Sequence, residues 1–131
     1  MKYEINEMLK TGGGAIVNNA SILGGVGFAG AAPYVSAKHG VVGLTKASAI
    51  EYATQNIRIN SVCPGFIETP MLEQAGITTN KDMAQAIAGL HPMKRMGKSQ
   101  EIADAVLWLS SDKSSFVTGQ SIFVDGGYVA Q

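Results

Sequence analysis

The sequence contains a single cysteine, Cys63, among its 131 residues. One cysteine excludes an intrachain disulfide, and its position in an apolar run predicts a buried, reduced thiol rather than a nucleophile. Charge is also scarce: 15% of the residues are charged, and ten basic residues balance ten acidic ones. This neutrality removes the electrostatic attraction that would draw the chain to nucleic acid or to an anionic membrane.

Long hydrophobic runs and metal-ligand patterns are missing as well. No apolar stretch approaches the ~20 residues needed to cross a bilayer, and Met1–Glu4 carries charges but no signal-peptide hydrophobic region. We therefore expect no membrane partner and a cytoplasmic location. Neither His39 nor His91 has a second histidine or a carboxylate at metal-ligand spacing, so we expect no metal site and treat both as structural.

The composition is 46% hydrophobic, which at this length suits a single domain over residues 1–131. Apolar runs and helical spacing alternate along the chain and predict three strands between helices. The expected strands are Ala15–Val17, Ile57–Val62 and Ser121–Val124, and the expected helices cover 1–9, 33–54 and 99–112, the last capped by Ser99. Residues 66–92 are expected to hold a loop and short helices.

This order of elements is typical of an α/β fold with an open parallel sheet. In such sheets ligands bind outside the carboxyl ends of the strands. That rule points to two segments, residues 18–34 and residues 63–69.

Tyr34 and Lys38 lie four positions apart in the expected long helix, which places both side chains on one face, one turn apart. A tyrosine hydroxyl ordinarily holds its proton up to about pH 10, and a nearby ammonium favours the phenolate. The pair is therefore a candidate proton donor or acceptor. Such a spacing is common by chance, and an exposed helix pair is the alternative interpretation.

Ser21 follows the first expected strand by a few residues, at the edge where ligands bind. Its hydroxyl can donate to a carbonyl oxygen on which charge develops. The alternative, favoured on position alone, is a turn serine that bonds its own backbone. Ser21, Tyr34 and the Pro64-Gly65 turn nevertheless all belong to one edge of the sheet, which favours a shared site.

These segments resemble the short-chain dehydrogenase/reductase family. The matching stretches are GAIVNNAS at 14–21, YVSAK at 34–38 and IRINSVCPGFIETPM at 57–71, followed by RMG at 95–97 and VDGG at 124–127. Thirteen positions separate Ser21 from Tyr34, the interval usual in that family. The resemblance covers nearly the whole chain, and it implies a partial Rossmann-like parallel sheet of about three strands with flanking helices.

The resemblance also implies roles. Tyr34 would exchange a proton with a carbonyl or alcohol substrate, Lys38 would assist it and bind the nicotinamide ribose, and Ser21 would hold the substrate oxygen. The implied site for NAD or NADP consists of Tyr34, Lys38, Pro64, Gly65, Ile67 and Thr69. Among these, the Ile67 backbone and Thr69 would lie near the carboxamide. A dimer or tetramer is also implied, because the family commonly buries the helix that begins near Pro33 against its copy.

The amino-terminal dinucleotide-binding half of that family has no counterpart here. A phosphate-binding turn must follow a strand and open a helix. Gly12-Gly13-Gly14 precedes a strand, and Gly24-Gly25-Val26-Gly27 lies in the loop between the serine and the tyrosine. Only the nicotinamide end of the cofactor is therefore expected to bind, and the choice between NAD and NADP is not encoded in this half.

Two functional hypotheses follow. The chain is either the catalytic half of an oxidoreductase that moves hydride between nicotinamide and a small carbonyl or alcohol, or a truncated, non-catalytic remnant that assembles with itself or with a full-length relative. An apolar substrate wall is expected from the segment after Glu68. Its residues would be Leu72, Ala75, Ile77, Met83 and Ile87.

Overall fold

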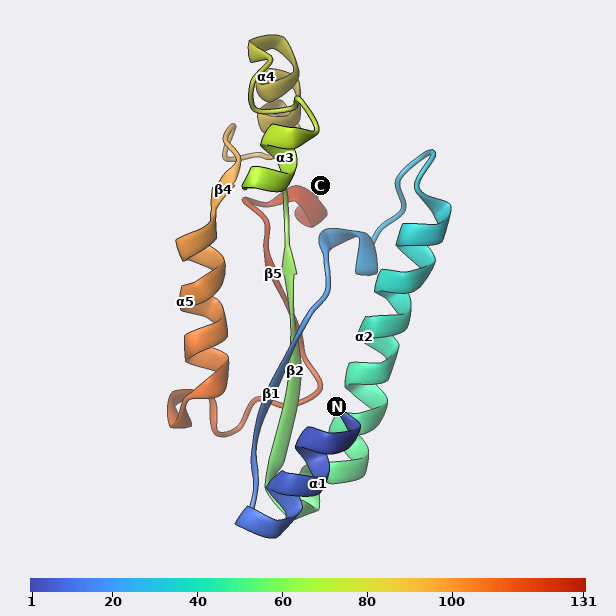
Figure 1. Cartoon of the computed structure of the whole chain (residues 1–131), viewed down its shortest axis with the longest axis vertical. Coiled ribbons are helices and arrows are strands. Elements are labelled where there is room, and N and C mark those ends of the chain that lie inside the picture. Colours follow the sequence, from blue (N-terminus) through green and yellow to red (C-terminus); the bar gives the residue numbers. More distant parts are fainter.

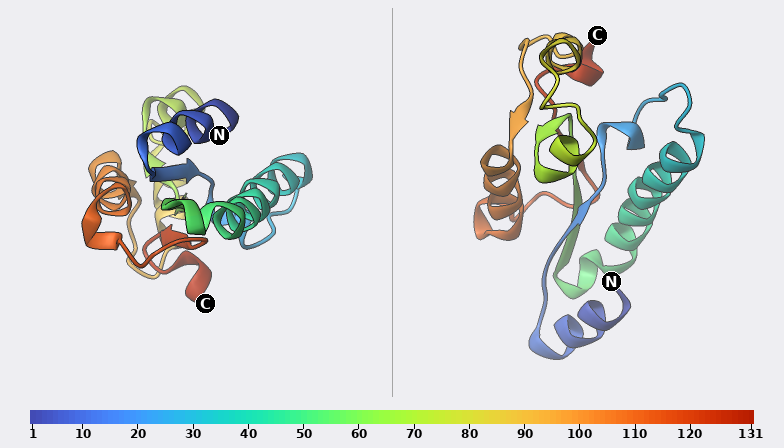
Figure 2. Two further views of the ribbon diagram at one scale, coloured as in Figure 1. Left: turned by 90° about the horizontal axis from the view of Figure 1, so that it is seen from below. Right: turned by 45° about the horizontal axis from the view of Figure 1, so that its top comes forward.

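A computed structural model describes all of residues 1–131, and its centre is a parallel sheet of three strands in the order β1-β2-β5 (Figure 1). The strands are β1 (Gly14–Asn19), β2 (Ile57–Pro64) and β5 (Ser121–Val124). Two helices, α1 (Lys2–Thr11) and α2 (Ala32–Tyr52), cover one face, and α5 (Ser99–Ser110) covers the other (Figure 2). The expected α/β fold with about three parallel strands and flanking helices is confirmed.

The core lies between α1, α2 and one face of β2. Because alternate residues of a strand point to the same face, Ile57 and Ile59 both pack against Ala49 of α2 and Ile5 of α1. Pro33 stands in the first turn of α2, where its missing N–H costs nothing. The helix is shorter than expected: α2 ends at Tyr52, and the next three residues form a 3-10 turn.

On the opposite face, Arg58 of β2 fixes the end of α5. Its guanidinium donates to the carbonyl oxygens of Leu109 at 2.9 Å and Ser111 at 3.1 Å, and to Ser114 Oγ at 2.9 Å. The last carbonyls of a helix have no partner within the helix. Arg58 therefore caps α5 and holds it against the sheet.

Short elements gather at the carboxyl end of β2, near the chain's own carboxyl terminus (Figure 1). They are β3 (Ile67–Glu68), α3 (Pro70–Gln74), α4 (Lys81–Gly89) and β4 (Gly97–Lys98). The pairing of β3 with β4 was not expected. The predicted cap of α5 was also wrong: Lys98 is the N-cap residue, and the Ser99 hydroxyl donates to the Glu68 carbonyl at 3.4 Å instead.

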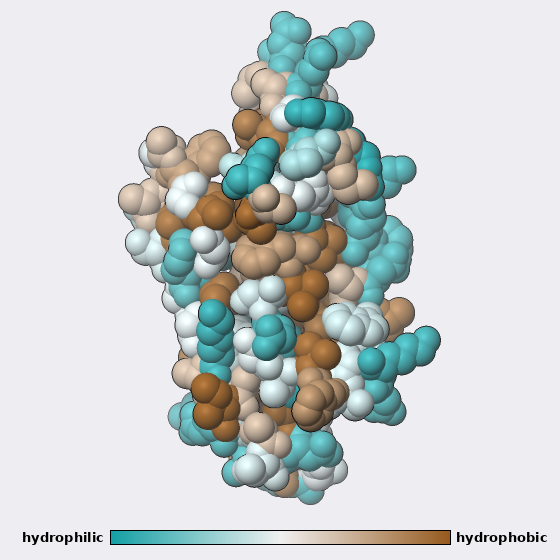
Figure 3. All heavy atoms as spheres, turned by 180° about the vertical axis from the view of Figure 1, so that it is seen from behind, coloured by the Kyte–Doolittle hydropathy of each residue, from teal (hydrophilic) through white to brown (hydrophobic).

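The β1 edge of the sheet has no strand partner on its outer side. β1 pairs with β2 alone, and residues 14–18 are only half-buried, whereas most of β2 is fully buried. Large hydrophobic side chains are exposed elsewhere too, and Figure 3 shows such side chains spread over the middle of one face. The most exposed are Phe116, Ile50, Tyr3, Met71, Leu107, Met93 and Leu44. No helix is long and apolar enough to span a membrane.

Candidate active site

A cavity of about 1020 Å³ opens at the carboxyl ends of β1 and β2 and continues along α5. All the site residues expected from the sequence line it, although they come from three separate stretches of chain. These residues are Ser21, Tyr34, Lys38, Pro64, Gly65, Ile67 and Thr69. The structure thus brings the expected catalytic and cofactor positions to one space.

Ser21 stands at the turn that follows β1. It is buried, and its Oγ accepts a hydrogen bond from Leu23 N at 3.2 Å, which caps a short 3-10 turn. This is the turn-serine geometry that the sequence left open as an alternative. A hydroxyl has one donor and two acceptor positions, so this bond leaves the Ser21 proton available to an oxygen in the cavity. The two interpretations of Ser21 are compatible.

Tyr34 and Lys38 lie one turn apart at the start of α2, as their spacing predicts. The Lys38 ammonium is 5.5 Å from the centre of the Tyr34 ring and donates to the Asn19 carbonyl at 3.1 Å. Tyr34 is 48% exposed and lines the cavity. The Asn19 contact ties α2 to the end of β1. It could not be predicted from the sequence, because any residue at position 19 would offer the same backbone carbonyl.

Gly24 sets the distance between Ser21 and the Tyr34–Lys38 pair. A Cβ at this position would lie 2.9 Å from the Lys38 carbonyl oxygen and 2.9 Å from Val42. Only glycine lets the turn after Ser21 approach α2 so closely. The serine and the tyrosine-lysine pair are therefore held together by packing.

The segment after β2 forms the neighbouring wall. Gly65 N donates to Val124 O at 3.1 Å, and Gly97 N donates to Phe66 O at 2.9 Å. Thr69 is the N-cap residue of α3, with its Oγ1 3.5 Å from Leu72 N. These contacts fix the segment of residues 64–67, which lines the cavity.

The expected apolar wall is only partly right. Of the five residues proposed for it, Leu72 alone lines the cavity, together with the neighbouring Met71. Further apolar lining comes from the turn after β1, with Ile22 and Leu23, and from α5, which the sequence did not connect with the site. The α5 side chains are Ile102, Ala103, Val106 and Leu107.

Cys63 and His39 contribute no reactive group. Burial raises the pKa of the Cys63 thiol, although hydrogen bonding to Ser61 opposes the shift, and the side chain is fully buried as expected. A thiol that stays protonated is a poor nucleophile. His39 is exposed, with Nδ1 3.0 Å from Val35 O. No group of three or more metal-ligating side chains occurs in the structure.

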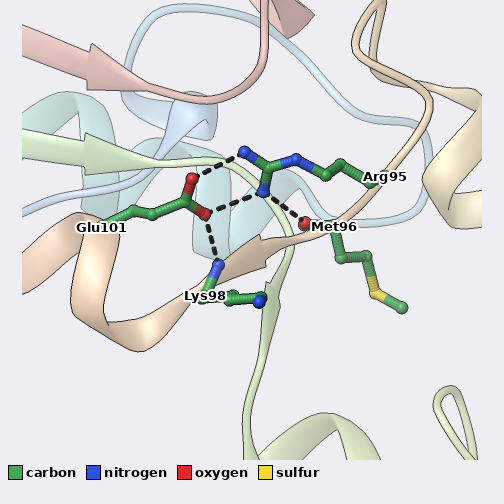
Figure 4. A network of polar contacts seen from close by, with 4 residues as sticks. All are labelled: Arg95, Met96, Lys98 and Glu101. Atoms are coloured by element: carbon green, nitrogen blue, oxygen red, sulfur yellow. Dashed lines mark hydrogen bonds and ion pairs between the residues drawn. The ribbon is translucent and has the colours of Figure 1, made fainter.

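An ion pair lies at the start of α5, the helix that lines part of the cavity (Figure 4). Glu101 accepts from both Arg95 nitrogens, at 2.8 and 2.6 Å, and from Lys98 N at 2.7 Å. The Arg95 guanidinium, and next the Lys98 N–H, lower the pKa of the Glu101 carboxyl to about 2. Because Lys98 belongs to β4, this network fixes the small β3-β4 sheet that carries Ile67.

Glu101→Gln is expected to change the acid stability of the protein. The pKa of Glu101 is lower in the folded chain, so its contribution is complete above the unfolded value of about 4.3 and is lost as the pH falls toward 2. The variant should therefore melt at a lower temperature at pH 7 and lose less on acidification between pH 5 and 2. Thermal unfolding across that range measures both effects.

Glu73→Gln is the matched control, because Glu73 makes no side-chain hydrogen bond or ion pair. It should melt like the wild-type chain at each pH. An acid transition in Glu101→Gln as steep as that of the wild type would contradict the role given to this carboxylate.

A family model described as "Enoyl-(Acyl carrier protein) reductase" matches residues 1–129. Cyclohexanol dehydrogenase of Acinetobacter sp. (strain SE19) is 49% identical over 131 residues, which are 100% of this chain and 49% of that protein. A 3-oxoacyl-[acyl-carrier-protein] reductase of Thermotoga maritima is 47% identical over 122 residues, 93% of this chain and 48% of its own length.

Solved structures are also similar to this chain. "ElxO with NADP Bound" superposes with a TM-score of 0.93 at 40% identity, covering 100% of this chain and 52% of that one. The chain thus spans about half the length of the relatives that it matches. Since the match extends over nearly every residue and includes the fold, the chain belongs to the short-chain dehydrogenase/reductase family.

Proposed function

We propose that this chain carries the reaction centre of an NAD(P)-dependent oxidoreductase that interconverts an alcohol and a carbonyl compound. One observation supports this above all others. Ser21, Tyr34 and Lys38 line one cavity with the segment that follows β2, although nothing in local structure requires these stretches to meet. A nicotinamide bound there would accept or supply the hydride.

The side chains divide the remaining work. Tyr34, exposed to the cavity, would give a proton to the substrate oxygen or take one from it. The Lys38 ammonium, 5.5 Å from the centre of the tyrosine ring, would place a positive charge beside the side chain that exchanges the proton. Ser21, whose oxygen is already fixed by Leu23 N, would donate its proton to the same substrate oxygen and hold it in place.

The chain's own residues fit one end of the cofactor. Lys38 offers an ammonium, Thr69 a hydroxyl and residues 64–67 a row of backbone groups, which suits a ribose and a carboxamide. No glycine-rich turn in the chain joins the end of a strand directly to the start of an α-helix, so the pyrophosphate lacks its usual partners. The relatives include structures with NADP bound, and we extend nicotinamide binding, but not the choice between NAD and NADP, to this chain.

A cyclic secondary alcohol is the substrate class that we favour. The cavity lining near Ser21 is apolar, with Ile22, Leu23, Met71 and Leu72. Three of the matching relatives are named for alicyclic alcohols: cyclohexanol, cis-4-hydroxycyclohexanecarboxylate and a dichlorocyclohexadienediol. An apolar ring with one hydroxyl directed at Ser21 and Tyr34 fits such a lining.

Titration of the isotope-labelled chain with reduced nicotinamide mononucleotide and with NADPH tests the proposal. Both are expected to shift the amide signals of Ser21, Lys38 and residues 65–69. Because only the nicotinamide end finds partners, their dissociation constants should agree within about tenfold, a difference of about 1.4 kcal/mol. Unshifted amides at these positions would refute the proposed reaction centre. A low-micromolar constant for NADPH would reveal a phosphate site.

The unpaired edge of β1 favours a second candidate function. In this alternative the chain is a non-catalytic remnant that assembles with itself or with a full-length relative through surfaces left open in the structure. An oligomer in solution without any nicotinamide binding would favour this alternative. An oligomer that binds nicotinamide would support both the proposed catalytic site and self-association.

A further inference from the structure

His91 is a buried histidine that packs against aromatic rings and also hydrogen-bonds to the backbone through both ring nitrogens. It follows α4, is 1% exposed, and lies against Phe66 and Tyr128, with ring centres 5.9 and 5.5 Å away. A buried polar ring requires a hydrogen-bond partner for each of its nitrogens. Both partners are present, and both are backbone groups.

Those partners determine the protonation of the ring. Phe66 N–H can only donate, and it lies 3.2 Å from His91 Nε2, so this nitrogen accepts. Ile87 O can only accept, and it lies 3.1 Å from Nδ1, so that nitrogen carries the proton. The hydrogen-bond network thus assigns the neutral Nδ1–H tautomer to His91.

The Phe66 contact matters because few bonds hold the segment that lines the cavity. Gly65 is bonded to Val124 of β5, and the Phe66 carbonyl to Gly97 of β4, both through backbone groups. His91 adds the one hydrogen bond to Gly65 or Phe66 that comes from a side chain. Losing it would leave the Phe66 N–H, which lies in a half-buried residue, without its protein partner.

Gly65 also packs closely against the His91 ring. A Cβ on Gly65 would lie 2.9 Å from His91 Nε2 and 3.0 Å from the Asp125 Cα. The backbone of Gly65 therefore rests directly on the ring. Behind the ring, the Asp125 carboxylate accepts from Gly127 N at 2.9 Å and Val129 N at 3.0 Å, which fixes the turn that carries Tyr128.

We propose that His91 is a positioning residue: its neutral imidazole connects α4 to Phe66 and thereby sets the Gly65–Ile67 backbone in the geometry that receives the nicotinamide end of the cofactor. The inference rests on the proposed function, since the segment matters only if nicotinamide binds beside it. His91 itself does not line the main cavity and touches no reacting atom.

The test compares His91→Ala and His91→Gln with His39→Ala in the isotope-labelled chain. His39 is a matched control, because its Nδ1 also lies near the carbonyl four residues earlier, but its ring is exposed. Long-range nitrogen–proton spectra report the tautomer, and hydrogen exchange reports the Phe66 amide. Titration with reduced nicotinamide mononucleotide reports affinity.

We expect the neutral Nδ1–H tautomer at His91 in the wild-type chain. In His91→Ala the Phe66 amide should exchange about tenfold faster, the scale of one lost hydrogen bond, and nucleotide affinity should fall severalfold. The glutamine variant, which can present an acceptor to Phe66, should restore part of both. His39→Ala should behave as wild type.

An Nε2–H tautomer in the wild-type chain, or a Phe66 amide equally protected in His91→Ala, would overturn the proposal. If His91→Ala fails to fold, the tautomer of the wild-type chain and the Phe66 amide exchange in His91→Gln test the proposal instead. Unchanged nucleotide affinity in His91→Ala, with wild-type binding intact, overturns only the role of His91. Absence of nucleotide binding in the wild-type chain overturns the proposed function and this role with it.

Discussion

Tyr34→Phe is expected to reduce turnover by at least about a hundredfold in a form of the protein that holds a complete cofactor, because a positioned proton donor or acceptor typically contributes that much or more. A chimera supplies such a form: the amino-terminal half of the Acinetobacter cyclohexanol dehydrogenase followed by this chain. The expected loss lies in kcat, since the hydroxyl acts on the transferred proton and not on cofactor binding. Steady-state kinetics with cyclohexanol, together with the KM for the cofactor, measure both.

Tyr52→Phe provides the control. It makes the same chemical change on the same helix, but Tyr52 packs against the core near Ile57, away from the cavity. The chimera with this variant should keep its activity. If Tyr34→Phe retains turnover within about threefold of the parent chimera, the proton is exchanged by another group and the proposed site is wrong.

The sequence could predict the sheet because each strand contains a short group of β-branched or other apolar residues bounded by turn residues. Ser121–Val124 was expected and is found with the same bounds. β2 extends two residues beyond the expected Val62, through a proline that would ordinarily end a strand. Pro64 is tolerated because its nitrogen would face β1, which has already ended at Asn19, while Gly65 N bonds to β5.

The candidate site was predictable in part for a related reason. Parallel strands bring their carboxyl ends to one edge, so Ser21 and Pro64-Gly65 had to lie near each other once the strands were known. The contribution of α5 and the contact of His91 with Phe66 depend on tertiary packing between distant segments. Two-residue strands such as β3 and β4 are too short to show periodicity. The pairing of β3 with β4, which holds Ile67, therefore left no pattern in the sequence.

Self-association is the other large effect that we expect. β1 has one strand neighbour, so its outer edge makes no backbone pairing with another strand. Gly14 N and Ala20 N donate toward β2, so by alternation the N–H groups of Ala15 and Val17 face outward. Native proteins rarely leave such an edge apolar and open, because it pairs readily with another chain. We therefore expect at least a dimer at micromolar concentration, measured by sedimentation.

Ala15→Pro tests whether this edge forms the contact. Proline is accepted on an edge strand where its missing N–H faces solvent, so the fold should persist while pairing is blocked and the dimer weakens by at least about tenfold. Ile16→Pro, whose N–H faces β2, should instead unfold the chain. A wild-type monomer would refute self-association. A dimer that survives Ala15→Pro would show that another surface forms the contact. The exposed Leu44 and Ile50 on α2 would then be tested next, because burial of an apolar helix face against a second copy is also favourable.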